Sequence, residues 1–165
     1  MRSRVGVGSV FAITVPLGEA LSAMPEAAAA ADTSTDTLVG LRVLCIDNDR
    51  EILDGMRALL GRWGVVALTG ATVDDALALL VERPDVALVD YHLHDRLDGL
   101  GVIDALREQG GRRLPAALLT GDGSDALKLA ARARGCAVLT KPVKPASLRA
   151  FLAAQRQTAE AIARD

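Results

Sequence analysis

The chain of 165 residues has few aromatic residues and few cysteines. Aromatic residues make up 2% of it and hydrophobic residues 50%, so a core must be built from Leu, Val, Ile and Ala. The two cysteines, Cys45 and Cys136, are too few for a disulfide framework and lack the spacing of a zinc site. We expect both to be buried free thiols, which agrees with a reducing cytoplasm.

The sequence also lacks a strong charge of either sign and any long apolar run. Its formal net charge of −2 argues against a dedicated nucleic-acid-binding protein, which usually carries a basic face. No apolar stretch approaches the roughly 20 residues that a membrane-spanning helix needs. The apolar segment near the start is a poor signal peptide, because Gly6 and Gly8 interrupt it and Pro16 ends it. We therefore expect contact with neither nucleic acid nor a membrane.

The length suits one domain with flanking segments. Residues 10–15 have the composition of a strand, which Pro16 would end. Residues 19–39 are rich in Ala, Thr, Ser and Asp and show little hydrophobic periodicity, so they are predicted to form a linker. The compact domain is expected to span residues 40–165.

From residue 41 the sequence alternates between strand and helix patterns five times. The apolar runs predicted to be strands are residues 41–47, 65–68, 85–89, 115–119 and 136–140. The helical patterns that follow them lie at about residues 52–60, 73–83, 99–109, 125–134 and 145–163. This alternation is typical of a doubly wound α/β fold, a five-stranded parallel sheet of the flavodoxin-like kind covered by five helices. We predict the strand order 2-1-3-4-5.

Residues with short polar side chains precede several of the predicted helices. Asp49, Thr72, Asp98 and Ser124 are predicted N-caps, because their side chains can accept hydrogen bonds from main-chain N–H groups of the first turn. In the second helix, the periodicity places Val81 on the face turned toward the core.

Polar residues also follow the apolar runs of four predicted strands. Asp47 ends the first strand and Asn48 follows it, while Asp90 follows the third strand. Thr120 follows the fourth strand and Lys141 follows the fifth. The C-terminal ends of parallel strands share one edge of the sheet, where ligands bind, so these side chains are expected to converge on Asp90.

Acids, a hydroxyl and an ammonium at one edge suit phosphoryl transfer onto a carboxylate. This transfer brings negative charge onto negative charge, so it needs a bridging cation and donors for the phosphoryl oxygens. Mg²⁺ prefers oxygen ligands, which Asp47, Asp90 and the main-chain carbonyl of His92 could supply. Thr120 can donate a hydrogen bond to one phosphoryl oxygen, and Lys141 can pair with another.

This arrangement resembles the receiver domain of two-component response regulators, over about residues 41–155. The resemblance implies that Asp90 is the phosphoacceptor, Thr120 the switch hydroxyl and Lys141 the lysine that pairs with the phosphoryl group. It also implies a cis peptide bond before Pro142, a histidine kinase as phosphodonor and a histidine phosphotransfer protein as a further partner. The motifs that carry it are Val43-Leu44-Cys45-Ile46-Asp47-Asn48-Asp49, Ala87-Leu88-Val89-Asp90, Leu119-Thr120-Gly121 and Leu139-Thr140-Lys141-Pro142.

The chain departs from the family pattern at two positions that bear on function. The second residue of the family's acidic pair, normally a direct metal ligand, is Asn48, so the pocket loses one negative charge. We predict weaker Mg²⁺ binding than in a receiver with two acids, since Asp49 is expected to cap a helix instead. The aromatic switch position of many receivers holds Val138, which predicts a different conformational readout.

A second resemblance involves the first residues of the chain. Residues 6–16 are similar to the Gly-x-Gly-Ser-x-Phe turn and final strand of a histidine-kinase ATP-binding domain, through Gly6, Gly8, Ser9 and Phe11. The similarity implies that residues 1–18 are a remnant of such a domain and that the parent is a hybrid sensor histidine kinase. A chance glycine turn before a strand is the alternative. This stretch lacks the kinase core, so we do not expect kinase activity from it.

Two functions of other classes stay open beside the phosphoacceptor receiver. A degenerate receiver that binds proteins independently of phosphorylation is favoured by Asn48 and Val138, and opposed by the retained acid, hydroxyl and lysine. A small phosphatase or nucleotide-binding enzyme would also use an aspartyl nucleophile at a strand end. Such a phosphatase usually has an acid two positions after the nucleophile, where this chain has His92.

Overall fold

The computed structural model of the chain describes residues 2–4, 8–10, 35–93, 97–111 and 114–162. The chain divides into two compact units, Met1–Asp32 and Thr33–Asp165. In the first unit, β1 (Arg2–Arg4) pairs antiparallel with β2 (Gly8–Val10). The strand predicted at residues 10–15 shares Val10 with β2, and its other residues lie outside the described ones.

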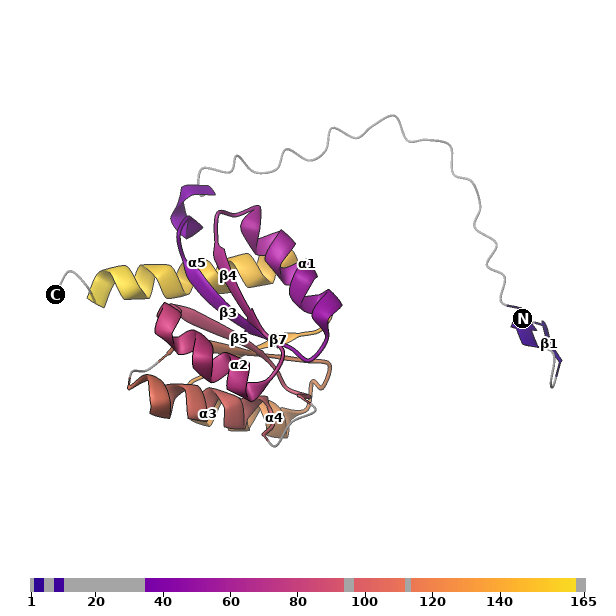
Figure 1. Cartoon of the computed structure of the whole chain (residues 1–165). Coiled ribbons are helices and arrows are strands. Elements are labelled where there is room, and N and C mark those ends of the chain that lie inside the picture. The colour runs from indigo at the N-terminus through magenta and orange to yellow at the C-terminus, as the bar shows by residue number, and fades with distance from the viewer. Residues whose placement is uncertain (1, 5–7, 11–34, 94–96, 112–113, 163–165) are drawn as a thin grey trace, which may run out of the picture. The chain divides into compact units, whose positions relative to one another are not determined.

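The second unit contains a five-stranded parallel sheet with the order β4-β3-β5-β6-β7 (Figure 1). Counted from β3, this is the predicted order 2-1-3-4-5, which is confirmed. β5 and β6 are buried along their whole length because the sheet is covered on both faces. The strands are β3 (Arg42–Ile46), β4 (Val66–Gly70), β5 (Val86–Asp90), β6 (Ala116–Thr120) and β7 (Ala137–Thr140).

Five α-helices and two short 3₁₀ helices accompany this sheet within the described residues. α1 and α5 cover one face and α2, α3 and α4 the other, each with a layer of buried apolar side chains (Figure 1). In the described part of the chain, no helix has the length and apolar character needed to cross a membrane. The helices are η1 (Thr35–Leu38), α1 (Arg50–Gly61), α2 (Val73–Ala78), η2 (Leu79–Glu82), α3 (Gly99–Gly110), α4 (Asp125–Ala133) and α5 (Pro145–Ile162).

The four predicted N-caps are confirmed. Asp49 accepts from Glu51 N at 2.9 Å, and Thr72 forms a reciprocal capping box with Asp75. The side chains of Asp98 and Ser124 accept from the third helical N–H in the same way. These caps fix where each helix leaves the sheet edge.

The second predicted helix differs from the structure in its last turn. α2 ends at Ala78 and the chain continues as the 3₁₀ helix η2, whose C-cap residue Arg83 has a φ of 53°. A 3₁₀ helix turns 120° per residue, so the α-helical period no longer decides which side chains face inward. Val81 is 81% exposed, and its predicted inward position is therefore wrong.

Both cysteines are buried free thiols, as expected. Burial raises the pKa of Cys45 to about 12, although the nearby Arg57 opposes this shift. Burial likewise raises the pKa of Cys136. The thiolate form that reacts or binds metal is therefore disfavoured at neutral pH, and both thiols act as small apolar core groups.

The core of the second unit extends into the segment before the sheet. Leu38, the last residue of η1, is 1% exposed and packs in the cluster that lies beneath α1 and α5. We expect Leu38→Ala to lower the free energy of unfolding by about 2–5 kcal/mol, because it leaves a cavity in a packed core. Val39→Ala, at a half-exposed neighbour, should change it by less than about 0.5 kcal/mol. Urea unfolding of both variants checks this, and equal small effects would contradict it.

Candidate functional site

The C-terminal ends of three neighbouring strands bring buried polar residues to one edge of the sheet. Asp47 directly follows β3, while Asp90 and Thr120 are the last residues of β5 and β6. Their exposed fractions are 3%, 5% and 0%. Because β5 lies between β3 and β6, Asp90 stands between the other two, as the sequence pattern indicates.

Lys141, directly after β7, reaches across to both acids. Its Nζ lies 2.9 Å from Oδ2 of Asp47 and 2.7 Å from Oδ1 of Asp90. Its main-chain N–H donates to the carbonyl of Thr120 at 2.7 Å, and the Lys141–Pro142 peptide bond is cis, as the family resemblance implies. One ammonium therefore bridges two buried carboxylates.

The second oxygen of each acid accepts a hydrogen bond from the main chain. Asp49 N donates to Oδ1 of Asp47 at 2.9 Å, and His92 N donates to Oδ2 of Asp90 at 3.0 Å. Each of these bonds closes a short loop over two residues. Both carboxylates are thus held in one orientation by main-chain donors.

The hydroxyl of Thr120 is oriented by the loop that follows it. The main-chain N–H of Asp122 donates to Oγ1 of Thr120 at 2.9 Å. The Asp122 carboxylate in turn accepts from Ser124 N and Oγ, at 2.8 and 3.0 Å. Because the Thr120 oxygen acts as an acceptor here, its hydrogen can be donated to a ligand at the sheet edge. The role of Asp122 was not found from the sequence, although a polar residue two positions after a threonine is a turn signal.

Two opposing effects act on the charge of Lys141. Burial disfavours the ammonium, but the hydrogen bonds and charges of Asp47 and Asp90 outweigh it and raise the pKa of Lys141 above 10.5. The ammonium is therefore present throughout the neutral range. A raised pKa means that the stability from this group is present below the ordinary pKa and is lost as the pH rises through the folded-state pKa.

Lys141→Met should therefore destabilise the protein in a pH-dependent way, because it leaves two buried carboxylates without their cation. The difference in free energy of unfolding from the unchanged protein is expected to be constant near neutral pH. It should shrink as the pH rises beyond 10.5. Lys144→Met, at an exposed lysine on the same loop, should show no such trend. A pH-independent difference for Lys141→Met would contradict the assigned ion pairs.

The loop after Asp90 is held close to the sheet by a glycine. Gly99 N donates to the carbonyl of Tyr91 at 3.0 Å. A Cβ at Gly99 would overlap the main-chain oxygen of Asp90 and stand 2.9 Å from the Cα of Tyr91. The exposed ring of His92 lies edge-on to that of Tyr91, with centroids 4.9 Å apart.

The donor set at this edge fits a hard divalent cation. The carboxylates of Asp47 and Asp90 are the oxygen donors that the structure brings together here. The carboxylate of Asp49 caps α1 instead. Among the described residues, no three His, Cys, Asp or Glu side chains lie close enough together to hold a metal ion. The site therefore suits Mg²⁺ in chemistry but offers it little negative charge.

Comparison with known proteins agrees with this geometry. The family model of the response regulator receiver domain matches residues 43–153, so the chain belongs to that family. It is therefore a receiver domain of the kind used in two-component signalling.

Individual relatives show how far the likeness extends. An uncharacterized 14.6 kDa protein in the sodA1 3' region of Leptolyngbya boryana is 32% identical over 114 residues, which are 68% of this chain and 87% of that protein. The chemotaxis protein CheY4 of Vibrio cholerae is 27% identical, with a TM-score of 0.62 over 69% of this chain and 97% of that chain. NtrX of Brucella abortus, also 27% identical, gives 0.66 over 74% of this chain and 28% of its own length.

Proposed function

We propose that the chain is a phosphoacceptor receiver of a two-component phosphorelay, in which a histidine kinase supplies the phosphoryl group and Asp90 receives it. The observation that carries this proposal is the position of the Lys141 ammonium, 2.9 Å from Asp47 and 2.7 Å from Asp90. A scaffold would gain little from two buried acids and a lysine at one sheet edge, because each buried charge costs free energy.

In the proposed transfer, an oxygen of Asp90 attacks the phosphorus of a phosphohistidine on the donor. The new O–P bond forms as the P–N bond breaks, and the imidazole leaves with the electron pair and takes up a proton. Lys141 and the hydroxyl of Thr120 would each bind a phosphoryl oxygen as charge develops there. Asp47, Asn48 and the carbonyl of His92 would hold Mg²⁺ beside Asp90, where it would offset the repulsion between carboxylate and phosphoryl oxygens.

The phosphoryl group would then pass to a histidine phosphotransfer protein or be lost to water. The proposed donor is the kinase part of the parent chain, a hybrid sensor histidine kinase to whose ATP-binding domain residues 1–18 would belong. A cytoplasmic location follows from that arrangement.

The alternative function is a degenerate receiver that binds a protein without phosphorylation. It is favoured by Asn48 at a ligand position and by Val138 at the position of the aromatic switch residue. Incubating the protein with acetyl phosphate, with and without Mg²⁺, separates the two functions by intact mass. A gain of one phosphoryl group that requires Mg²⁺ supports the phosphoacceptor, and no gain at any Mg²⁺ concentration supports the degenerate receiver.

A further inference from the structure

Residues 35–41, which we call the N-terminal clip, precede the stretch that matches the receiver family. They are nevertheless part of its folded core. Leu38 and Leu41 are 1% and 2% exposed and belong to the same apolar cluster as the buried leucines of α1 and α5. The family domain of this chain is thus extended by a short element at its N-terminal end.

A main-chain hydrogen bond links the clip to the loop after α1, because Gly40 N donates to the carbonyl of Gly64 at 2.9 Å. Within the clip, Leu41 N donates to the carbonyl of Leu38 at 3.0 Å. Gly64 has a φ of 72°, and a Cβ there would stand 2.9 Å from Cγ2 of Val39. The loop after α1 and the clip are therefore shaped to fit each other.

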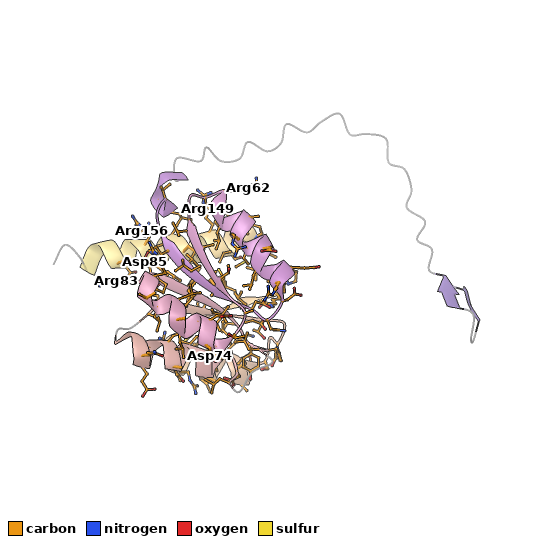
Figure 2. The ribbon with its side chains drawn as sticks, in the orientation of Figure 1. Arg62, Asp74, Arg83, Asp85, Arg149 and Arg156 are labelled. Carbon is orange, nitrogen blue, oxygen red and sulfur yellow. The ribbon has the colours of Figure 1, made fainter. Side chains whose placement is uncertain are left out.

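The clip also lies against α5, which extends beyond the C-terminal end of the family match as the clip extends beyond its N-terminal end. α5 continues to Ile162, beyond residue 153, and η1 packs against it (Figure 1). Figure 2 labels Arg62, the C-cap of α1, and Arg149 and Arg156 of α5. The Arg149 guanidinium lies 5.8 Å from the centre of the Trp63 ring, which joins α5 to the loop after α1.

The opposite end of α5 begins close to the site. Pro145, its first residue, comes four positions after Lys141, and Val143 between them packs against the cluster that contains Leu38. Leu148 and Leu152, both fully buried, continue that contact along the helix. A helix of 18 residues is about 27 Å long. The helix α5 thus begins four residues after Lys141 and packs against η1 of the clip.

We infer that the clip is the output of this receiver: phosphorylation of Asp90 draws Lys141 away from Asp47, shifts α5, and loosens the clip. The state of the site would then reach the chain before residue 35. This inference rests on the proposed function. It gives a way to transmit the phosphorylation state that does not need an aromatic residue at position 138, where this chain has Val138. Packed helices move as units, because close-packed interiors are not continuously deformable.

Hydrogen exchange at the clip amides tests this inference on the full chain. After incubation with acetyl phosphate and Mg²⁺, the amides of Gly40 and Leu41 should exchange faster by about fivefold or more, the lower bound of typical coupling between sites. The amide of Arg83, which donates to Leu80 at the end of the other 3₁₀ helix, serves as the control and should not change. Asp90→Asn treated in the same way should show no change at either place.

The outcomes separate the inference from the function on which it rests. A sample whose intact mass shows the phosphoryl group, but whose Gly40 and Leu41 amides exchange as before, overturns the inference and leaves the proposed function standing. Equal acceleration at Arg83 also overturns it, because it would indicate general loosening. Failure to take up a phosphoryl group defeats the proposed function, and the inference with it. Leu148→Val, a mild change at the site end of α5, should reduce the clip response while Asp90 is still phosphorylated.

Discussion

Replacing Gly99 with alanine is expected to destabilise the receiver by about 3 kcal/mol or more, at the upper end of overpacking costs. The new Cβ would overlap the main-chain oxygen of Asp90 and stand 2.8 Å from a side-chain carbon of Leu118. The strand β5 and the start of α3 would have to separate, since one of the clashing atoms is main chain. The displaced residue is the proposed phosphoacceptor, so phosphoryl uptake should fall as well.

Chemical unfolding of Gly99→Ala checks this expectation. Gly55→Ala, inside α1 with nothing within 4 Å of the added Cβ, is the matched control. It should stabilise the protein by about 0.5–1 kcal/mol, because alanine is the better helix former. A loss below about 1 kcal/mol for Gly99→Ala would show that the loop after Asp90 yields easily, and that the close approach does not fix the site.

Replacing Asn48 with aspartate is expected to raise the affinity for Mg²⁺ by about tenfold or more, equivalent to about 1.4 kcal/mol. The donor set has two carboxylates, both already paired with one ammonium. A third carboxylate adds the negative charge that a hard dication prefers, so that Mg²⁺ competes better with Lys141 for the other two carboxylates. The effect should be larger for Mg²⁺ than for a monovalent cation.

Titration followed by NMR shifts of the Asp49 and His92 amides measures that affinity, because these amides donate to the two acids. Asp49→Asn is the matched control, since the Asp49 side chain accepts from Glu51 N as the N-cap of α1. Equal Mg²⁺ affinities for Asn48→Asp and the unchanged protein would mean that position 48 is not a metal ligand.

The strand order and the closeness of Asp47 to Asp90 could be predicted from the sequence, because both depend on local patterns of apolar and polar residues. Continuous apolar runs alternating with amphipathic segments define a parallel sheet, and that topology alone places the residues at the C-terminal ends of β3, β5, β6 and β7 at one edge. The pairing of Lys141 with Asp47, 94 positions earlier, follows from this placement. No pairwise signal in the sequence was needed for it.

What the sequence did not reveal depends on contacts between distant segments. Val81 fits a helical period, but the chain had already changed to a 3₁₀ helix before reaching it. Leu38 stands in a stretch of linker-like composition and is ordered by α5, more than a hundred residues away. Gly99 is read from sequence as an ordinary first helical residue, and the main-chain oxygen of Asp90 that requires it is visible only in three dimensions.

The measurement that tests the central claim most directly is intact mass after incubation with acetyl phosphate and Mg²⁺, for the unchanged protein, Asp90→Asn and Asp47→Asn. We expect one phosphoryl group on the unchanged protein and none on Asp90→Asn. Asp47→Asn should still be phosphorylated, but more slowly, because it loses a cation-binding carboxylate and keeps the acceptor. Phosphorylation of Asp90→Asn to the same extent as the unchanged protein would contradict the assignment of Asp90.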